Sequence, residues 1–279
     1  MISTIPQRFK TETGLAYTKS GSGPALVLIH GVGLRLEAWM RQFEAFNRHF
    51  TVYAVDMPGH GESDIMPQCR CIEDYTDVIA RWVKQDIRQP VLIMGHSMGS
   101  MIALNFASRY QEWCLGTVAF NSVFRRSEEA KAAVQERVKQ IKSSLTHLHT
   151  TAPVKRWFDF PLSKLDEENA QLCTEWLSTV SLPGYSQAYE VFCHNDGPED
   201  DELRNLSMPA LFITGSDDPN STPAMSAAMG ALCPVGESRI ISHAKHMAPM
   251  THSGEINEIV IDFALSCIEA QSIEYEQQG

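Results

Sequence analysis

Residues 91–99 read VLIMGHSMG, an apolar run that ends in a G-x-S-x-G element, and the helical sequence SMIALNFASRY follows at 100–110. A sharp turn from a strand into a helix holds the serine in a strained conformation with its Oγ exposed, and crowding at this turn requires glycine at 95 and 99. The new helix points its N-terminal N–H groups toward the same place, which suits developing negative charge. The stretch therefore predicts that Ser97 is a nucleophile at the end of a strand.

Similar apolar runs alternate with helical patterns along most of the chain. Continuously apolar runs are typical of parallel strands that are covered on both faces. The further predicted strands are Ala25–His30, Thr51–Asp56, Gly116–Asn121, Ala210–Gly215 and Ser238–Ser242. Amphipathic stripes between them, such as the one from Ile72 to Val83, predict helices. The alternation predicts an α/β fold, with a mostly parallel twisted sheet flanked by helices.

The alternation breaks from about Phe124 to Leu206, where the residues favour helices and form no convincing strand pattern. Because the apolar strand pattern resumes at Ala210, this segment is expected to be a helical lid inserted into one catalytic domain. The predicted organisation is a catalytic domain made of residues 1–123 and 207–279, with a helical cap at 124–206.

Composition narrows the classes of partner and the compartment. The chain has 279 residues, with 23 Lys and Arg against 34 Asp and Glu, which gives a formal net charge of −11. This charge argues against nucleic acid or an anionic membrane surface as a partner. The seven cysteines are scattered and odd in number, unlike a disulfide framework or a zinc site. Without a signal-peptide pattern or an apolar run of about 20 residues, a cytoplasmic protein with no membrane insertion is expected.

A glycine turn, His30-Gly31-Val32-Gly33, follows the predicted strand at 25–30. Such a turn can aim the backbone N–H of Val32 into a pocket above the sheet, where the N–H of Met98 would join it as an oxyanion hole. The alternative is a plain turn at the end of a strand. His30 is expected to pack beneath the turn rather than to act in catalysis.

Two later loops offer an acid and a base for the serine. Asp217 and Asp218 follow the strand at 210–215, and a carboxylate at the carboxyl end of a strand is well placed to orient a histidine. Asp218 is preferred over Asp217. His243 and His246 follow the last predicted strand, and His246 is preferred as the base. Catalysis of this kind requires no metal and no organic cofactor.

Five stretches together resemble the α/β-hydrolase fold superfamily, in its single-chain, lid-bearing serine esterase-like branch. They are HGVG (30–33), DMPGHGESD (56–64), GHSMGS (95–100), GSDDPNSTP (215–223) and HAKHMAP (243–249). The resemblance implies a catalytic triad in the chain order Ser97, Asp218, His246.

The chain departs from several related branches of this superfamily at the expected catalytic positions, and these departures exclude or disfavour their activities. Haloalkane dehalogenases and soluble epoxide hydrolases of this fold use an aspartate nucleophile, and this chain has Ser97. Hydrolases of ring-cleavage products usually carry Trp after the catalytic histidine, whereas Met247 stands here, which disfavours C–C bond hydrolysis. Some members place the acid after the strand before the lid, but 120–123 contains no carboxylate, which supports Asp218.

The predicted activity is hydrolysis of a carboxylic ester, with a small or medium, neutral and partly apolar acyl group, through an acyl-enzyme. The side chains expected to bind substrate are Trp157, Phe158, Tyr185 and Met247. For an anionic substrate the anchors would be Arg125, Arg126 and Arg156, and their alternative role is solvated surface charge.

Other activities stay open on the same residues. A lactonase or a C–C bond hydrolase would use the same triad, and a perhydrolase side reaction would use peroxide as the acceptor. A non-enzymatic small-ligand receptor is a different class, which a complete triad disfavours. The expected partner is a small-molecule acyl substrate, and the sequence leaves a homo-oligomer open.

Overall fold

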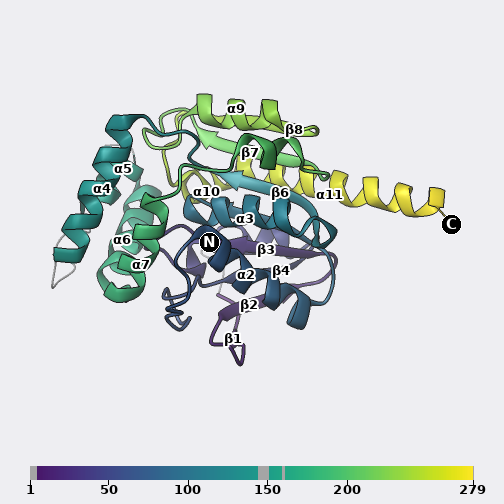
Figure 1. Ribbon diagram of the computed structural model, residues 1–279, viewed down its shortest axis with the longest axis horizontal. Coiled ribbons are helices and arrows are strands. Elements are labelled where there is room, and N and C mark those ends of the chain that lie inside the picture. The colour runs from purple at the N-terminus through teal and green to yellow at the C-terminus, as the bar shows by residue number, and fades with distance from the viewer. Residues whose placement is uncertain (1–4, 144–150, 159–160, 279) are drawn as a thin grey trace.

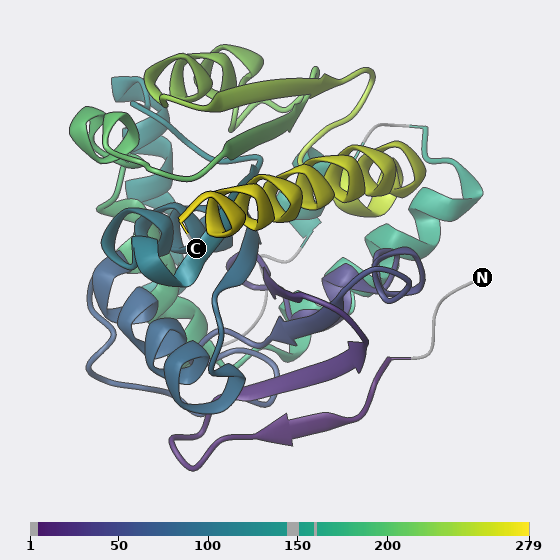
Figure 2. The same cartoon turned by 90° about the vertical axis from the view of Figure 1, so that its right-hand side faces the viewer.

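The computed structural model describes residues 5–143, 151–158 and 161–278. Its strands are β1 (Arg8–Lys10), β2 (Ala16–Gly21), β3 (Ala25–Ile29), β4 (Thr51–Val55), β5 (Val91–His96), β6 (Cys114–Phe120), β7 (Ala210–Gly215) and β8 (Gly236–Ile241). They form one eight-stranded sheet in the order β1-β2-β4-β3-β5-β6-β7-β8 (Figures 1 and 2). The pairings β1–β2 and β2–β4 are antiparallel, and the pairings from β4 to β8 are parallel. The predicted fold class is confirmed.

Helices cover both faces of this sheet (Figure 2). They are η1 (Leu36–Trp39), α1 (Phe43–Phe46), α2 (Ile72–Trp82), η2 (Val83–Ile87), α3 (Met98–Arg109), η3 (Gln111–Trp113), α4 (Glu128–Ser143), α5 (Thr151–Trp157), α6 (Lys164–Thr179), α7 (Leu182–Cys193), α8 (Asp200–Arg204), α9 (Pro223–Leu232), α10 (Ala248–Thr251) and α11 (Ser253–Gln278). Within the described ranges, none has both the length and the apolar character needed to cross a bilayer.

The sheet separates two apolar cores. On β3, Leu26 and Leu28 pack with residues of α1 and α11, whereas Val27 and Ile29 pack with residues of α2 and α3. Side chains alternate between the faces of a strand, so a strand covered on both faces is apolar at every position. This explains why β3 could be recognised as one continuous apolar run.

The predicted strands at 25–30, 51–56, 91–95, 116–121, 210–215 and 238–242 correspond to β3 to β8, with shifts of one or two residues at their ends. The antiparallel strands β1, at the edge of the sheet, and β2, beside it, were not predicted. Their sequences, RFK and AYTKSG, are polar and partly exposed, because these strands are covered less completely than the central ones. The apolar-run criterion therefore failed at this edge of the sheet.

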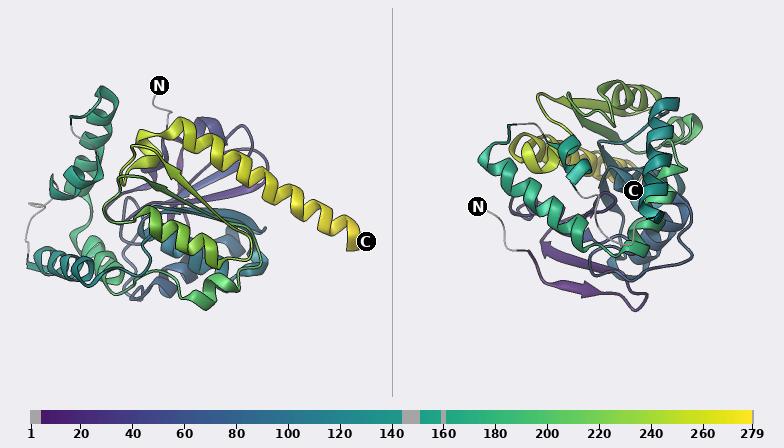
Figure 3. Two further views of the ribbon diagram at one scale, coloured as in Figure 1. Left: turned by 90° about the horizontal axis from the view of Figure 1, so that it is seen from above. Right: turned by 90° about the vertical axis from the view of Figure 1, so that its left-hand side faces the viewer.

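Helices α4 to α8 lie between β6 and β7 in the chain, and α4 to α7 are grouped beside one end of the sheet (Figures 1 and 3). Ser163 caps α6, because its Oγ accepts a hydrogen bond from Asp166 N at 3.1 Å. Helix α8 lies apart from this group, against α3, where Asn105 Nδ2 donates to Glu202 Oε1 at 3.4 Å. The division into a catalytic domain and a cap stays a prediction.

Parallel pairing aligns the carboxyl ends of the central strands. Ile29 pairs with Gly95, and on the other side of the sheet Gly215 pairs with Ile241. The loops after β3, β5, β7 and β8 therefore meet at one edge of the sheet, where ligands of open α/β sheets bind. These are the loops that contain the predicted catalytic residues.

Candidate active site

Ser97 stands at the turn from β5 into α3, with φ 55° and ψ −120°. A positive φ is costly for a residue with a side chain, and such strain is typical of functional turns. A Cβ on Gly95 would lie 2.0 Å from Gly99 O, and one on Gly99 would lie 2.3 Å from Ile29 O, so this turn tolerates only glycine at both positions. Its geometry is the strand-to-helix elbow that the sequence predicts.

His246 and Asp218 are brought together from the loops after β8 and β7. His246 Nδ1 lies 2.8 Å from Asp218 Oδ2, and both side chains are buried. Asp218 also accepts hydrogen bonds from Asn121 Nδ2 at 2.7 Å and Asn220 N at 2.8 Å. Burial alone would raise the pKa of the Asp218 carboxyl, but the charge and hydrogen bond of His246, together with these donors, lower it below its ordinary value. Asp218 is therefore held as a carboxylate that orients the imidazole. Because Nδ1 binds this carboxylate, Nε2 is the ring nitrogen that would act as the base.

The two alternative residues lie elsewhere. Asp217 is exposed and accepts a hydrogen bond from Ser216 Oγ at 2.9 Å, while the exposed His243 donates its backbone N–H to the same Ser216 Oγ at 2.9 Å. The geometry thus favours Asp218 and His246, although their catalytic roles stay predictions.

His96, which the sequence did not single out, supports the loop that contains His246. Its Nε2 lies 2.7 Å from the His246 carbonyl oxygen, and the two rings lie 4.8 Å apart. Burial lowers the pKa of His96 to about 3, so its ring is neutral and Nε2–H donates. A histidine within the G-x-S-x-G element was the available signal, since it ends β5 and directly precedes the serine.

Two more buried histidines hold the turn after β3. Gly33 N donates to His60 Nε2 at 3.0 Å, and Met57 N donates to His30 Nε2 at 2.9 Å. Burial lowers the pKa of His30 to about 4 and that of His60 to about 3, so both rings are neutral. His30 packs beneath the turn, as the sequence predicts.

The predicted oxyanion donors lie beside Ser97. A Cβ on Gly31 would lie 3.1 Å from Ser97 Cβ, so the backbone of the turn approaches the serine closely, and the next residue, Val32, lines the same cavity as Ser97. Met98 is the first residue of α3, so its N–H has no acceptor within the helix. The backbone is therefore suitably arranged for two donors at Ser97.

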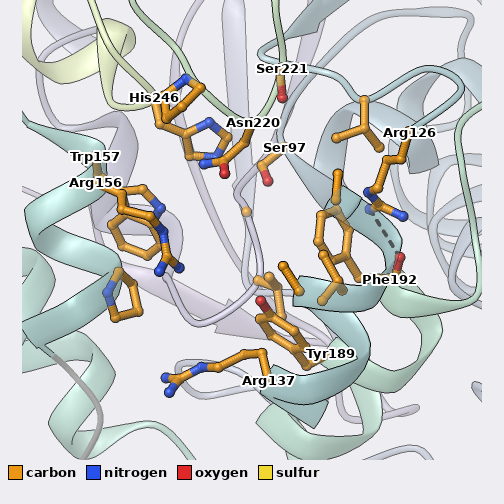
Figure 4. A pocket seen from close by; sticks show the side chains of 18 of the residues that line it. Ser97, Arg126, Arg137, Arg156, Trp157, Tyr189, Phe192, Asn220, Ser221 and His246 are labelled. Atoms are coloured by element: carbon orange, nitrogen blue, oxygen red, sulfur yellow. Dashed lines mark hydrogen bonds between the residues drawn. The ribbon is translucent and has the colours of Figure 1, made fainter. Parts of the chain in front are cut away.

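A cavity of about 700 Å³ opens over Ser97 and His246 and extends between α4, α5 and α7 (Figure 4). Two of the predicted binding side chains, Trp157 and Tyr185, line it, and the Trp157 and His246 rings lie 6.0 Å apart. Phe158 and Met247 are buried at 1% exposure each and are not among the described residues that line this cavity. Each is directly next to a residue that lines the cavity, Trp157 and His246, but its own side chain is buried in the core. A sequence pattern cannot distinguish a cavity-lining side chain from a buried neighbour.

Of the three arginines named from the sequence, Arg126 and Arg156 line the cavity, and Arg137 joins them as a residue that the sequence did not reveal. Arg125 points away from this wall and pairs with Asp200 at the surface. Guanidinium groups therefore form part of the wall of this cavity.

The neutral buried histidines predict how stability depends on pH. In the unfolded chain a histidine titrates near 6.5, whereas His30, His60 and His96 titrate at about 4, 3 and 3. As pH falls from 7 to 5 the unfolded chain binds more protons, so stability decreases by up to about 1.4 kcal/mol per pH unit for each histidine. Urea unfolding at each pH should show this decrease. His96→Gln should reduce the slope of the unfolding free energy against pH by the contribution of about one proton, whereas the exposed His243→Gln should not. An unfolding free energy that does not change between pH 7 and pH 5 would contradict the neutral state of these histidines.

The elbow, the hydrogen-bonded His246–Asp218 pair and the sheet order are those of an α/β hydrolase. The model of the alpha/beta hydrolase fold family matches residues 24–253, and the chain belongs to this family. It is 34% identical to an (E)-2-((N-methylformamido)methylene)succinate hydrolase from Acinetobacter baylyi, over 92% of this chain and 96% of the relative. It is 26% identical to a 3-oxoadipate enol-lactonase of that species, over 76% of this chain and 79% of the relative. A thermophilic esterase from Thermogutta terrifontis superposes with a TM-score of 0.83 at 22% identity, covering 94% and 99% of the two chains.

Proposed function

We propose that this hydrolase is serine-dependent and cleaves a carboxylic ester through an acyl-enzyme. The observation that supports this most strongly is the strained Ser97 elbow facing the same cavity as the buried His246–Asp218 pair. A nucleophile, a base and an orienting acid are the set that acyl transfer requires.

In this mechanism Ser97 Oγ attacks the acyl carbonyl carbon while His246 Nε2 takes the hydroxyl proton. The N–H groups of Val32 and Met98 stabilise the tetrahedral oxyanion, and each such donor typically contributes about 3 kcal/mol. His246 then gives its proton to the leaving alkoxide, and the acyl group stays on Ser97. A water molecule, deprotonated by His246, then attacks the acyl carbon; the Ser97 Oγ–acyl bond breaks, His246 returns the proton to Ser97 Oγ, and the carboxylic acid is released. Asp218 stabilises the imidazolium in both halves of the reaction.

We further propose that residues 124–206 act as the cap of a catalytic domain made of 1–123 and 207–279. The cavity supports this division, because its wall opposite Ser97 comes from α4, α5 and α7, including Val134, Trp157 and Tyr189. Selection of the acyl group would then depend on these helices.

Lactone hydrolysis is the second candidate, since a lactone is an internal ester and its opening follows the same steps. The similarity to the 3-oxoadipate enol-lactonase favours it. Enol-lactones and open-chain esters should therefore be compared side by side in the first substrate screen.

Covalent labelling tests the proposed function. A fluorophosphonate probe should label the wild-type chain at Ser97, identified by mass spectrometry of the modified peptide, because only an activated serine attacks this phosphorus centre at a useful rate. Ser97→Ala should not be labelled, and Ser100→Ala, in the first turn of α3, is the matched control that should be. An unlabelled wild type that also leaves p-nitrophenyl acetate intact would refute the proposal.

A further inference from the structure

The charged side chains in the cavity wall are unevenly placed. Three arginines line it, at positions 126, 137 and 156. The two acidic residues of the wall, Glu129 and Glu136, are exposed, as is Arg156, and Glu136 lies 3.7 Å from Lys139. Arginines therefore outnumber acidic residues in the cavity wall, although the chain as a whole is acidic.

The guanidinium of Arg126 already has hydrogen-bond acceptors within the protein. Its buried guanidinium donates to Asp196 Oδ1 at 2.9 Å and to the carbonyl oxygens of Asn195 and Phe192. It also lies over the Phe192 ring, 4.3 Å from the centroid. These contacts make Arg126 a structural support of the wall.

Arg156 is in a different situation. It extends from α5 beside Trp157, and Figure 4 shows its guanidinium directed into the cavity. Among the residues that the structure describes, no carboxylate lies within ion-pair distance of it. A guanidinium has five donors in a planar fork, which suits a carboxylate of the ligand.

Arg137 and Arg156 act on the same two tyrosines. Burial raises the pKa of Tyr185 and raises that of Tyr189 to about 12, and the positive charges of Arg137 and Arg156 oppose both shifts. The two hydroxyl groups, protonated at neutral pH, therefore lie in the field of both arginines. Their rings pack edge to face, 5.6 Å between centroids. This convergence places two cations and two hydroxyl donors around one region of the cavity.

We propose that this region, formed by Arg137, Arg156, Tyr185 and Tyr189, binds a carboxylate of the substrate remote from the ester that Ser97 attacks. The inference rests on the proposed function and replaces the neutral acyl group with an anionic one. The substrate class is the half-ester of a dicarboxylic acid, or a lactone that bears a carboxylate. Apolar wall residues such as Val32, Val123 and Val134 would contact the chain between the two ends.

Two substrates of equal acyl chain length test this inference. Mono-4-nitrophenyl glutarate and 4-nitrophenyl pentanoate have acyl chains of the same length and differ only in a terminal carboxylate or methyl group. After subtraction of the uncatalysed rates, the wild type should prefer the glutarate in kcat/KM by at least about tenfold, the equivalent of about 1.4 kcal/mol. Raising the ionic strength should reduce the preference, because screening weakens charge attraction.

Variants identify the groups responsible. Arg156→Gln and Arg137→Gln should each lower the glutarate-to-pentanoate ratio about tenfold, and Arg156→Lys should restore part of it, because lysine keeps the charge but not the fork. Arg125→Gln, outside the cavity, is the matched control and should keep the wild-type ratio. Preference for the pentanoate in the wild type, or a ratio unchanged in both glutamine variants, would overturn the inference.

A binding measurement separates this inference from the proposed function. Glutarate contains no ester bond, so calorimetry of Ser97→Ala with glutarate measures binding of the dicarboxylate without turnover. Binding that disappears in Ser97→Ala/Arg156→Gln supports the subsite even if Ser97 resists the fluorophosphonate. Labelling of Ser97 without glutarate binding leaves the serine hydrolase intact and refutes the subsite.

Discussion

Ser97→Ala should lower kcat for an ester substrate by about 10⁶-fold, as expected when the nucleophile of a triad is removed. The loss should be this large because the proposed roles of His246 and Asp218 both act through Ser97 Oγ. The substitution removes only Oγ, and alanine meets the same strain as serine at φ 55°, so the fold should be retained. The measurement is single-turnover and steady-state kinetics, with circular dichroism to verify folding.

The residual rate is informative as well. Donors at Val32 and Met98 should still stabilise an oxyanion formed by direct attack of water, so the variant should exceed the uncatalysed rate by about 10³-fold. Retention of more than about 1% of wild-type kcat in Ser97→Ala would show that another group is the nucleophile.

Asp218→Asn should lower kcat by about 10⁴-fold, whereas Asp217→Asn should change it less than about threefold. An amide at position 218 no longer stabilises the imidazolium and favours the wrong tautomer of His246. The amide also has an NH₂ group where the carboxylate has a second acceptor oxygen. Asn121 Nδ2, which donates to Asp218 Oδ2 at 2.7 Å, could then face another donor. Asp217 is exposed and bonds only to Ser216 among the described side chains, so its amide variant is the matched control.

A ranking reversed between these two variants would assign the acid to Asp217. The pH profile gives a second readout, because kcat/KM of the wild type should require a neutral His246 and should fall on acidification.

The sequence predicted the parallel strands and the elbow because burial on both faces and a tight turn leave strong local patterns. Val91–His96 is apolar throughout, and Gly95 and Gly99 are imposed by backbone contacts of 2.0 and 2.3 Å that any Cβ would make. Strands β1 and β2 left no such pattern, since they are partly exposed and carry polar residues. The apolar-run pattern was therefore too weak at these two strands to predict them.

The site was predictable where a loop follows a strand and unpredictable where helices converge. Asp218 and His246 could be inferred from their place after β7 and β8. Asn121, which binds Asp218, was noted only as part of a stretch without a carboxylate, because its partner is distant in sequence. Arg137 lies on an amphipathic helix among other charged residues, and only the packing of α4 beside α7 brings it to the cavity wall.

The insertion between β6 and β7 has a consequence for how such a protein diversifies. The residues proposed for bond cleavage belong to loops of the sheet, outside 124–206, whereas the charged wall residues Arg126, Arg137 and Arg156 all lie inside that single continuous segment. One recombination event, or one grafted gene fragment, could exchange the whole wall and leave the catalyst in place. Changes of substrate preference during the evolution of such proteins would then be recorded in one contiguous stretch of the gene.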